Sequence, residues 1–234
     1  MHLDALFNYE AIKQWLPYIA RGLNITLAVA FLAAAIGLVI GIFINILSRR
    51  KVLGKLAFYY VDLFRGTPVL LQLSLVYYAL PRMLTVLLVS GFGVHVDLRL
   101  TAFSAAVLTF SLNSSAYVSE IIRSGIHSVD KGEIEAATAL GVSKFHIYKD
   151  IILPIAFKNA FPAMMNEMIT LVKESSIVSL IGLQDLMRRQ QIVTAQTYLY
   201  FEPLIVVGIF YYAIVKLLAF TGKRIEMRLH HVQS

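Results

Sequence analysis

The sequence predicts an all-α membrane protein with about five transmembrane helices. Its 234 residues are 58% hydrophobic and only 15% charged, and the mean hydropathy is +0.71. A soluble domain usually carries about 25% charged residues, so this composition favours the bilayer as solvent. Two stretches without a formal charge, 22–48 and 100–119, are long enough for one helix to cross a ~30 Å hydrocarbon layer. We therefore expect a single membrane domain over 1–234.

The first such stretch holds the 27 residues between Arg21 and Arg49. It is too long for a signal-peptide core and has no preceding basic segment, so we expect it to remain in the chain as a span. Five spans place the two termini on opposite sides of the membrane. The five spans are expected over about 23–47, 57–80, 100–120, 160–182 and 203–222.

The basic residues predict which side is cytoplasmic, because short loops rich in lysine and arginine are retained there. Twelve basic residues lie in 48–55, 121–158 and 223–234, against six in 1–22, 81–100 and 183–202. We expect a multi-pass protein of the bacterial plasma (inner) membrane with its N-terminus outside and its C-terminus in the cytoplasm.

Composition also excludes several classes of chemistry. The chain has no cysteine, and its six histidines are scattered, so we expect no metal site and no catalytic residue. The net charge of +7 indicates orientation rather than nucleic-acid binding. Gly54-Lys55 and Gly222-Lys223 both lack the rest of a phosphate-binding loop, so this chain is not expected to hydrolyse ATP or to hold a cofactor.

The long connection over 121–158 predicts two short helices that meet at a sharp corner. Asp130 can cap the first helix, and Gly141 stands where a left-handed residue would end it. Ser143 can cap the second helix, which we expect to break near Pro154. Such a corner suits docking on another protein, whereas an amphipathic loop on the lipid headgroups would satisfy the same pattern.

These residues resemble the cytoplasmic loop of permease subunits of ATP-binding-cassette importers. The matching positions are Glu135-Ala136-Ala137, Gly141 and Ile151 to Leu153-Pro154. Two further stretches are similar to the branch that imports polar amino acids, namely Arg65-Gly66-Thr67-Pro68 with Gln72, and Ala116-Tyr117 with Glu120-Ile121, Arg123, Gly125-Ile126 and Ser128-Val129. Glu133 stands where many relatives have glutamine.

The resemblance implies a type I importer permease working by alternating access. Glu135 to Gly141 would form a coupling helix in a groove of a separate ATP-hydrolysing subunit, which would bind the ATP and magnesium. The complete assembly would contain two ATP-hydrolysing subunits and an extracytoplasmic binding protein. It would also contain a second permease, which is either another copy of this chain or a homologue. Glu135 would contact the partner through a charge-assisted bond, or else remain a solvated helix charge.

Polar residues inside two expected spans are candidates for the substrate path. Asn113, Tyr117 and Glu120 share one face of the third span, although its serines can simply bond to their own helix. In the fourth span Glu167, Thr170 and Glu174 share a face, and Lys173 is turned by about 100°. Lys173 could instead form an ion pair that only joins helices.

The tetrapeptide Arg65-Gly66-Thr67-Pro68 predicts a break in the second span. Thr67 is expected as the N-cap and Pro68 as the first residue of a restarted helix. Its positive end would be open to a substrate carboxylate, or the break would be a structural kink.

We expect an importer permease for polar amino acids. One alternative is an importer of another small zwitterion. The other is a self-contained ion-coupled carrier or channel that uses the intramembrane carboxylates.

Overall fold

The computed structural model describes residues 7–93 and 98–231. Within these ranges the chain is almost entirely helical and contains no strand. Parts of the expected outer segments, residues 1–6 and 94–97, and the tail 232–234 lie outside the described residues.

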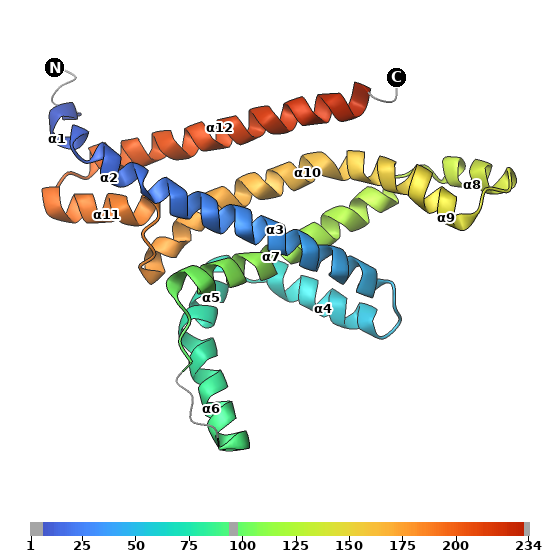
Figure 1. Ribbon diagram of the computed structural model, residues 1–234, viewed down its shortest axis with the longest axis horizontal. Helices are drawn as coiled ribbons and strands as arrows, with labels where there is room; N and C mark the ends of the chain where they lie inside the picture. Colours follow the sequence, from blue (N-terminus) through green and yellow to red (C-terminus); the bar gives the residue numbers. More distant parts are fainter. Residues whose placement is uncertain (1–6, 94–97, 232–234) are drawn as a thin grey trace.

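Four long helices lie roughly along one direction and form the body of the molecule (Figure 1). They overlap the expected first, third, fourth and fifth spans, and a 3-10 turn, η4 (Ser175–Ile181), extends the fourth. The last three also reach into the expected cytoplasmic segments 121–158 and 223–234. The helices are α3 (Gly22–Ser48), α7 (Ala102–His127), α10 (Leu153–Glu174) and α12 (Phe201–His231). Their shared core is apolar and includes Val29, Phe110, Leu171 and Val172.

A seam of small residues joins α3 to α7. A Cβ added to Gly41 would lie 2.7 Å from Val118 Cγ1 and 2.9 Å from the Ser115 carbonyl oxygen. One turn earlier, a Cβ on Gly37 would lie 3.1 Å from Ser114 Cβ. Glycines four residues apart therefore let the two backbones approach closely, as small residues do between membrane helices.

The second span differs from the expected helix over 57–80. The helix α4 (Leu53–Gly66) ends before an extended Thr67 and Pro68, and the chain restarts in a different direction (Figure 1). The restarted helix comprises α5 (Val69–Ser74), a π-helical turn η2 (Leu75–Ala79) and α6 (Leu80–Phe92). It extends into the expected loop 81–100, because the residues after Pro81 are apolar despite Arg82.

Within the part of the chain that the structure describes, three helical stretches are long and apolar enough to cross a membrane: Leu16–Ser48, Val69–Gly91 and Phe201–Leu229. The helices α7 and α10 are of comparable length and carry the polar residues noted in the sequence.

The remaining helices lie at the two ends of the body. One end holds α1 (Tyr9–Lys13), α2 (Leu16–Ala20) and α11 (Leu186–Thr197), and the other holds α8 (Lys131–Ala139) and α9 (Lys144–His146) (Figure 1). From α9 the helix runs on through a π-helical turn, η3 (Ile147–Ile152), into α10. The expected break near Pro154 is therefore absent: the π-helical turn η3 changes the backbone hydrogen-bond spacing directly before the proline, and the helix continues past it.

Asp185 fastens α11 to the body. Its buried carboxylate caps α11 by accepting from the Arg188 N–H at 2.8 Å, and the Tyr211 hydroxyl of α12 lies 3.4 Å away. The Leu186 N–H donates to Thr26 of α3. Burial raises the pKa of the Asp185 carboxyl to about 6.

Candidate functional site

The break between α4 and α5 is held by two side-chain amides. Gln72 Nε2 donates to the carbonyl oxygens of Phe64 at 2.9 Å and Thr67 at 3.1 Å, and also lies 2.8 Å from Thr67 Oγ1. Asn113 Nδ2 of α7 donates to the same Phe64 carbonyl at 3.1 Å and to Gln72 Oε1 at 3.0 Å. These bonds satisfy carbonyls that the interrupted helix leaves without partners.

Thr67 does not cap the restarted helix as expected. Pro68 occupies the N-cap position of α5, and the Thr67 hydroxyl instead donates back to the Leu63 carbonyl at 2.8 Å. The cap residue thus lies one position later than the sequence indicated, because Thr67 and Pro68 both adopt extended backbone.

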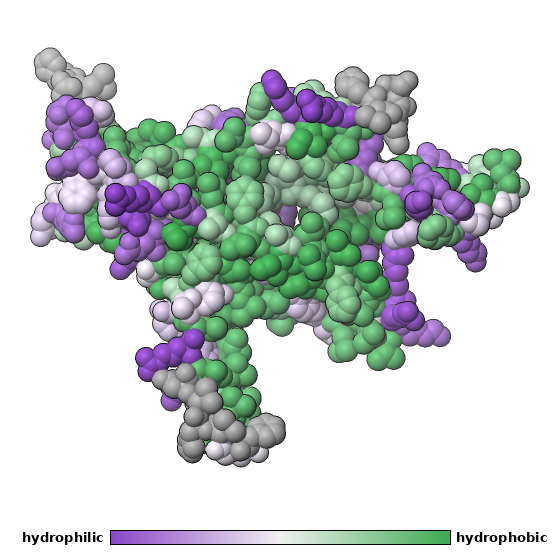
Figure 2. Space-filling model, in the orientation of Figure 1, coloured by the Kyte–Doolittle hydropathy of each residue, from purple (hydrophilic) through white to green (hydrophobic). Residues whose placement is uncertain are grey.

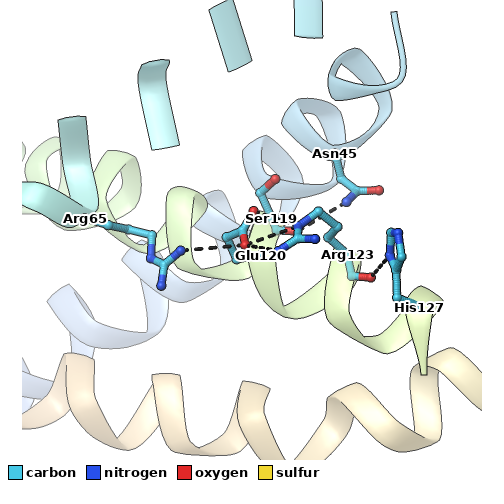
Figure 3. Close-up of polar contacts among 6 residues, drawn as sticks. All are labelled: Asn45, Arg65, Ser119, Glu120, Arg123 and His127. Carbon is cyan, nitrogen blue, oxygen red and sulfur yellow. Dashed lines mark hydrogen bonds and ion pairs between the residues drawn. The ribbon is translucent and has the colours of Figure 1, made fainter. Parts of the chain in front are cut away.

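A charged cluster lies beside this break, on α4 and α7 (Figure 3). Glu120 accepts from Arg123, one turn later, with Nη2 to Oε2 at 2.7 Å and Nε to Oε1 at 3.0 Å. Arg65 Nη1 lies 3.7 Å from the same carboxylate, and its guanidinium stands over the Tyr117 ring at 5.4 Å. One carboxylate therefore holds two guanidinium groups that come from different helices.

The cluster lines a cavity of about 740 Å³ between α3, α4 and α7. A smaller cavity of about 390 Å³ between α7 and α10 shares the same four side chains. The shared residues are Arg65, Tyr117, Glu120 and Arg123. Guanidinium groups bind carboxylates in a bidentate manner, and Glu120 supplies the opposite charge, so the site has the chemistry to bind a zwitterion.

The polar stripe of α10 lies elsewhere. Glu167 lies beside Ser114 of α7 and is half-buried, as are Thr170 and Glu174, whereas Lys173 is exposed. Among the described residues that line the two cavities, none belongs to this stripe. The structure therefore brings Arg65, Gly66, Tyr117 and Glu120 together at one cavity, and it places Asn113 in the helix break instead.

Hydroxyls of α7 largely bond to their own helix, which confirms the structural interpretation of that part of the polar face. Thr109, Ser111 and Ser115 donate to carbonyl oxygens three or four residues earlier at 2.6 to 2.8 Å.

The corner between α8 and α9 forms as predicted. Asp130 caps α8 by accepting from the Gly132 N–H at 2.7 Å, and Gly141 adopts a left-handed φ of +75°. The Val142 N–H donates to the Ala137 carbonyl and the Gly141 N–H to the Thr138 carbonyl, which is a Schellman motif. Ser143 caps α9 at 3.5 Å.

The corner presents an exposed surface at one end of the molecule. Glu135 and Ala136 are exposed, whereas Ala137 is buried against the chain that follows. Leu140 is 84% exposed and Phe145 is 69% exposed, and Figure 2 shows hydrophobic surface at this tip. Large apolar side chains held outward on a rigid corner favour contact with a partner.

Two residues of this region, Arg123 in the cluster and Gln72 in the helix break, were quoted for the resemblance but were given no role by reasoning from the residues alone. Arg123 is three positions after Glu120, a spacing that pairs opposite charges on a helix, and this signal could have identified it. The role of Gln72 could not be read from spacing, because it depends on how the broken helix folds back.

Comparisons with known proteins concern the chain and its fold as a whole. Residues 37–231 match the family described as binding-protein-dependent transport system inner membrane component. The arginine transport system permease protein ArtQ of Bacillus subtilis (strain 168) is 47% identical over 231 residues, 98% of each chain. A putative glutamine transport system permease protein, GlnP, of Rickettsia bellii (strain RML369-C) is 46% identical over 91% of this chain and 93% of its own. A crystal structure of an amino acid ABC transporter with histidines superposes with a TM-score of 0.83 at 37% identity, covering 94% of this chain and 98% of that chain.

Proposed function

Because this chain belongs to the family of binding-protein-dependent transport system inner membrane components, we propose that it carries polar amino acids into the cell. It is the membrane-embedded permease subunit of an ATP-binding-cassette importer, with the helical fold of a type I permease. ATP hydrolysis belongs to a partner subunit, and a binding protein delivers substrate. Relatives named for arginine and glutamine support polar amino acids as the substrate class.

The α8 corner is the observation that carries the proposed coupling. Glu135 and Ala136 point into solvent on a slim helix, and Leu140 and Phe145 are exposed beside them. We assign Glu135 to Gly141 as the segment that seats in the ATP-hydrolysing subunit, where ATP and magnesium bind. The Schellman bonds hold the corner rigid, so movement of the partner is passed into η3 and α10.

We assign the cavity between α3, α4 and α7 to the inner part of the substrate path. Arg65 and Arg123 can meet the substrate carboxylate. The ion pair between Arg65 and Glu120 joins α4 to α7, so it can open and close as these two helices move. Glu167, Thr170, Lys173 and Glu174 of α10 are proposed to meet the substrate's ammonium and side chain once a second permease completes the path.

The proposed assembly contains two permeases, either two copies or a copy with a homologous permease, together with two ATP-hydrolysing subunits. Its place is the bacterial inner membrane, with the N-terminus outside and the C-terminus in the cytoplasm. Figure 1 supports this orientation, because the end of α3, the α8 corner and the end of α12 lie at one end, and α1, α2 and α11 at the other.

The coupling is tested by reconstituting the chain with its ATP-hydrolysing subunit and binding protein in proteoliposomes. We expect ATP turnover and amino acid uptake to require all three proteins, and Glu135→Ala to lower both in parallel. The matched control is Glu133→Ala, which removes a charge two residues away on the same helix. Uptake without the ATP-hydrolysing subunit would refute the proposal in favour of a self-contained carrier.

The orientation is tested separately, in intact cells. Since the chain has no cysteine, Ser143→Cys introduces a single thiol at the α8 corner. We expect an impermeant external reagent to leave this thiol unlabelled until the cells are opened. Labelling before opening would place the corner outside and overturn the orientation.

A further inference from the structure

An apolar groove runs along α3 on the side of α7 and α10. Its volume is about 450 Å³, and its walls include Leu38, Ile42 and Ile46 of α3 with Leu153 and Phe157 of α10. These five side chains are between 38% and 56% exposed, so they are open to their surroundings. Figure 2 shows a broad hydrophobic face where α3 and α10 lie in Figure 1.

Small residues give the groove its depth. Ala156 and Ala160 of α10 line it, and they lie against Gly125 of α7 so closely that a Cβ on Gly125 would meet the Ala156 carbonyl oxygen at 2.7 Å and Ala160 Cβ at 2.9 Å. The two helices therefore touch through their backbones at this level. Short side chains here leave room that larger ones would fill.

The length of the groove corresponds to one leaflet. From Leu38 to Arg49, both of which line it, α3 rises by about 16 Å at ~1.5 Å per residue. That is about half of the ~30 Å hydrocarbon thickness of a bilayer. A single acyl chain lying along α3 would thus reach from the membrane midplane to the headgroup level.

The end of the groove is strongly basic. Arg49 Nη2 donates to the Tyr148 hydroxyl at 3.1 Å, and the guanidinium stands 5.5 Å from the centre of the Tyr148 ring. Arg49 also lines an adjoining depression of about 460 Å³ together with Arg50, Lys51 and Lys55. Residues 49–55 contain four basic residues and no acidic one.

We propose that the groove binds one acyl chain of an anionic phospholipid of the cytoplasmic leaflet, with the lipid phosphate held by Arg49 and its basic neighbours. A guanidinium matches the geometry of phosphate oxygens, and clustered basic residues next to a membrane helix attract anionic lipid. Free phosphate would leave the apolar walls unused, and a neutral lipid would leave the basic end unused. The leaflet assignment rests on the orientation given under the proposed function.

The test titrates the assembled transporter in detergent with phosphatidylglycerol or with phosphatidylcholine of the same acyl chains, and counts bound lipids by native mass spectrometry. We expect phosphatidylglycerol to bind more tightly, and Arg49→Gln to weaken its binding about fivefold. Arg21→Gln, at the opposite end of α3, is the matched control and should change nothing. Equal affinity for the two lipids, or equal effects of the two variants, would overturn the proposal.

A second pair of variants tests the acyl chain. Ile42→Trp fills the groove and should lower lipid binding, whereas Val39→Trp, on the same helix and outside the lining, should leave it unchanged. Disulfide formation between two copies that carry Ile42→Cys would show that a second copy occupies the groove, and it would refute lipid binding there. Because the readout is lipid binding, it can fail while ATP-driven uptake persists, so the two proposals are separable.

Discussion

Replacing Gly141 by valine isolates one backbone conformation at the α8 corner. A Cβ at Gly141 would meet no atom within 4 Å, so the substitution creates no clash. Its entire cost is the left-handed φ of +75°, which a residue with a Cβ adopts at about 1–2 kcal/mol. That cost lowers the population of the correct corner by a factor of about 5–30.

The effect should appear in coupling and not in membrane folding. We expect Gly141→Val to reduce ATP turnover stimulated by the binding protein about 5–30-fold in the reconstituted complex, at an unchanged melting temperature of the permease. Gly141→Asn should retain most of the turnover, because asparagine tolerates the left-handed region. Gly208→Val is the matched control, since Gly208 also has open space around it but lacks a positive φ.

Wild-type turnover in Gly141→Val, at equal assembly with the ATP-hydrolysing subunit, would refute the reasoning. So would an equal loss in the Asn and Val variants, because the backbone argument separates those two residues. A loss in the Gly208 control would show that the assay responds to added bulk.

Three further predictions concern the body of the molecule. Gly41→Val should destabilise the permease by about 1–3 kcal/mol in detergent unfolding, because its side chain would overlap Val118 and the Ser115 carbonyl, and unchanged stability would contradict the close α3–α7 seam. Asp185 ionises at about 6 when folded and near 3.8 when unfolded, so the native state binds more protons between these values and its stability should fall by about 3 kcal/mol as the pH rises through them. Asp185→Asn keeps an N-cap and should remove this dependence, and a variant that retains it would exclude Asp185 as the cause. Glu174→Gln should reduce lysine uptake about 10–100-fold and glutamine uptake less, and equal effects on both would eliminate direct contact with the substrate.

Much of the fold follows from local patterns in the sequence. The length of the mainly apolar stretches predicted the four long helices. The caps at Asp130 and Ser143 and the left-handed Gly141 formed where short-range chemistry predicted them. These features depend on residues within one helical turn, and so they can be read from one chain.

The second span could not be read in the same way. Its interruption at Thr67 and Pro68 was visible, but the new direction depends on Gln72 and Asn113, which are 41 residues apart and share the Phe64 carbonyl. The residues of the substrate path could not be predicted fully for the same reason. Asn113 and Glu120 share a face of α7, but tertiary contacts bury Asn113 in the helix break and leave Glu120 at a cavity.

The projecting helix formed by α5, η2 and α6 has a consequence for how the transporter is made. The side chains over Val69–Gly91 are almost all unburied within the chain, with Met83, Val86 and Leu87 between 58% and 60% exposed. A helix that forms all of its backbone hydrogen bonds internally can insert into the bilayer alone and associate with other helices afterwards. Substitutions on α6 should therefore leave the folding of each subunit unchanged and alter the association between subunits.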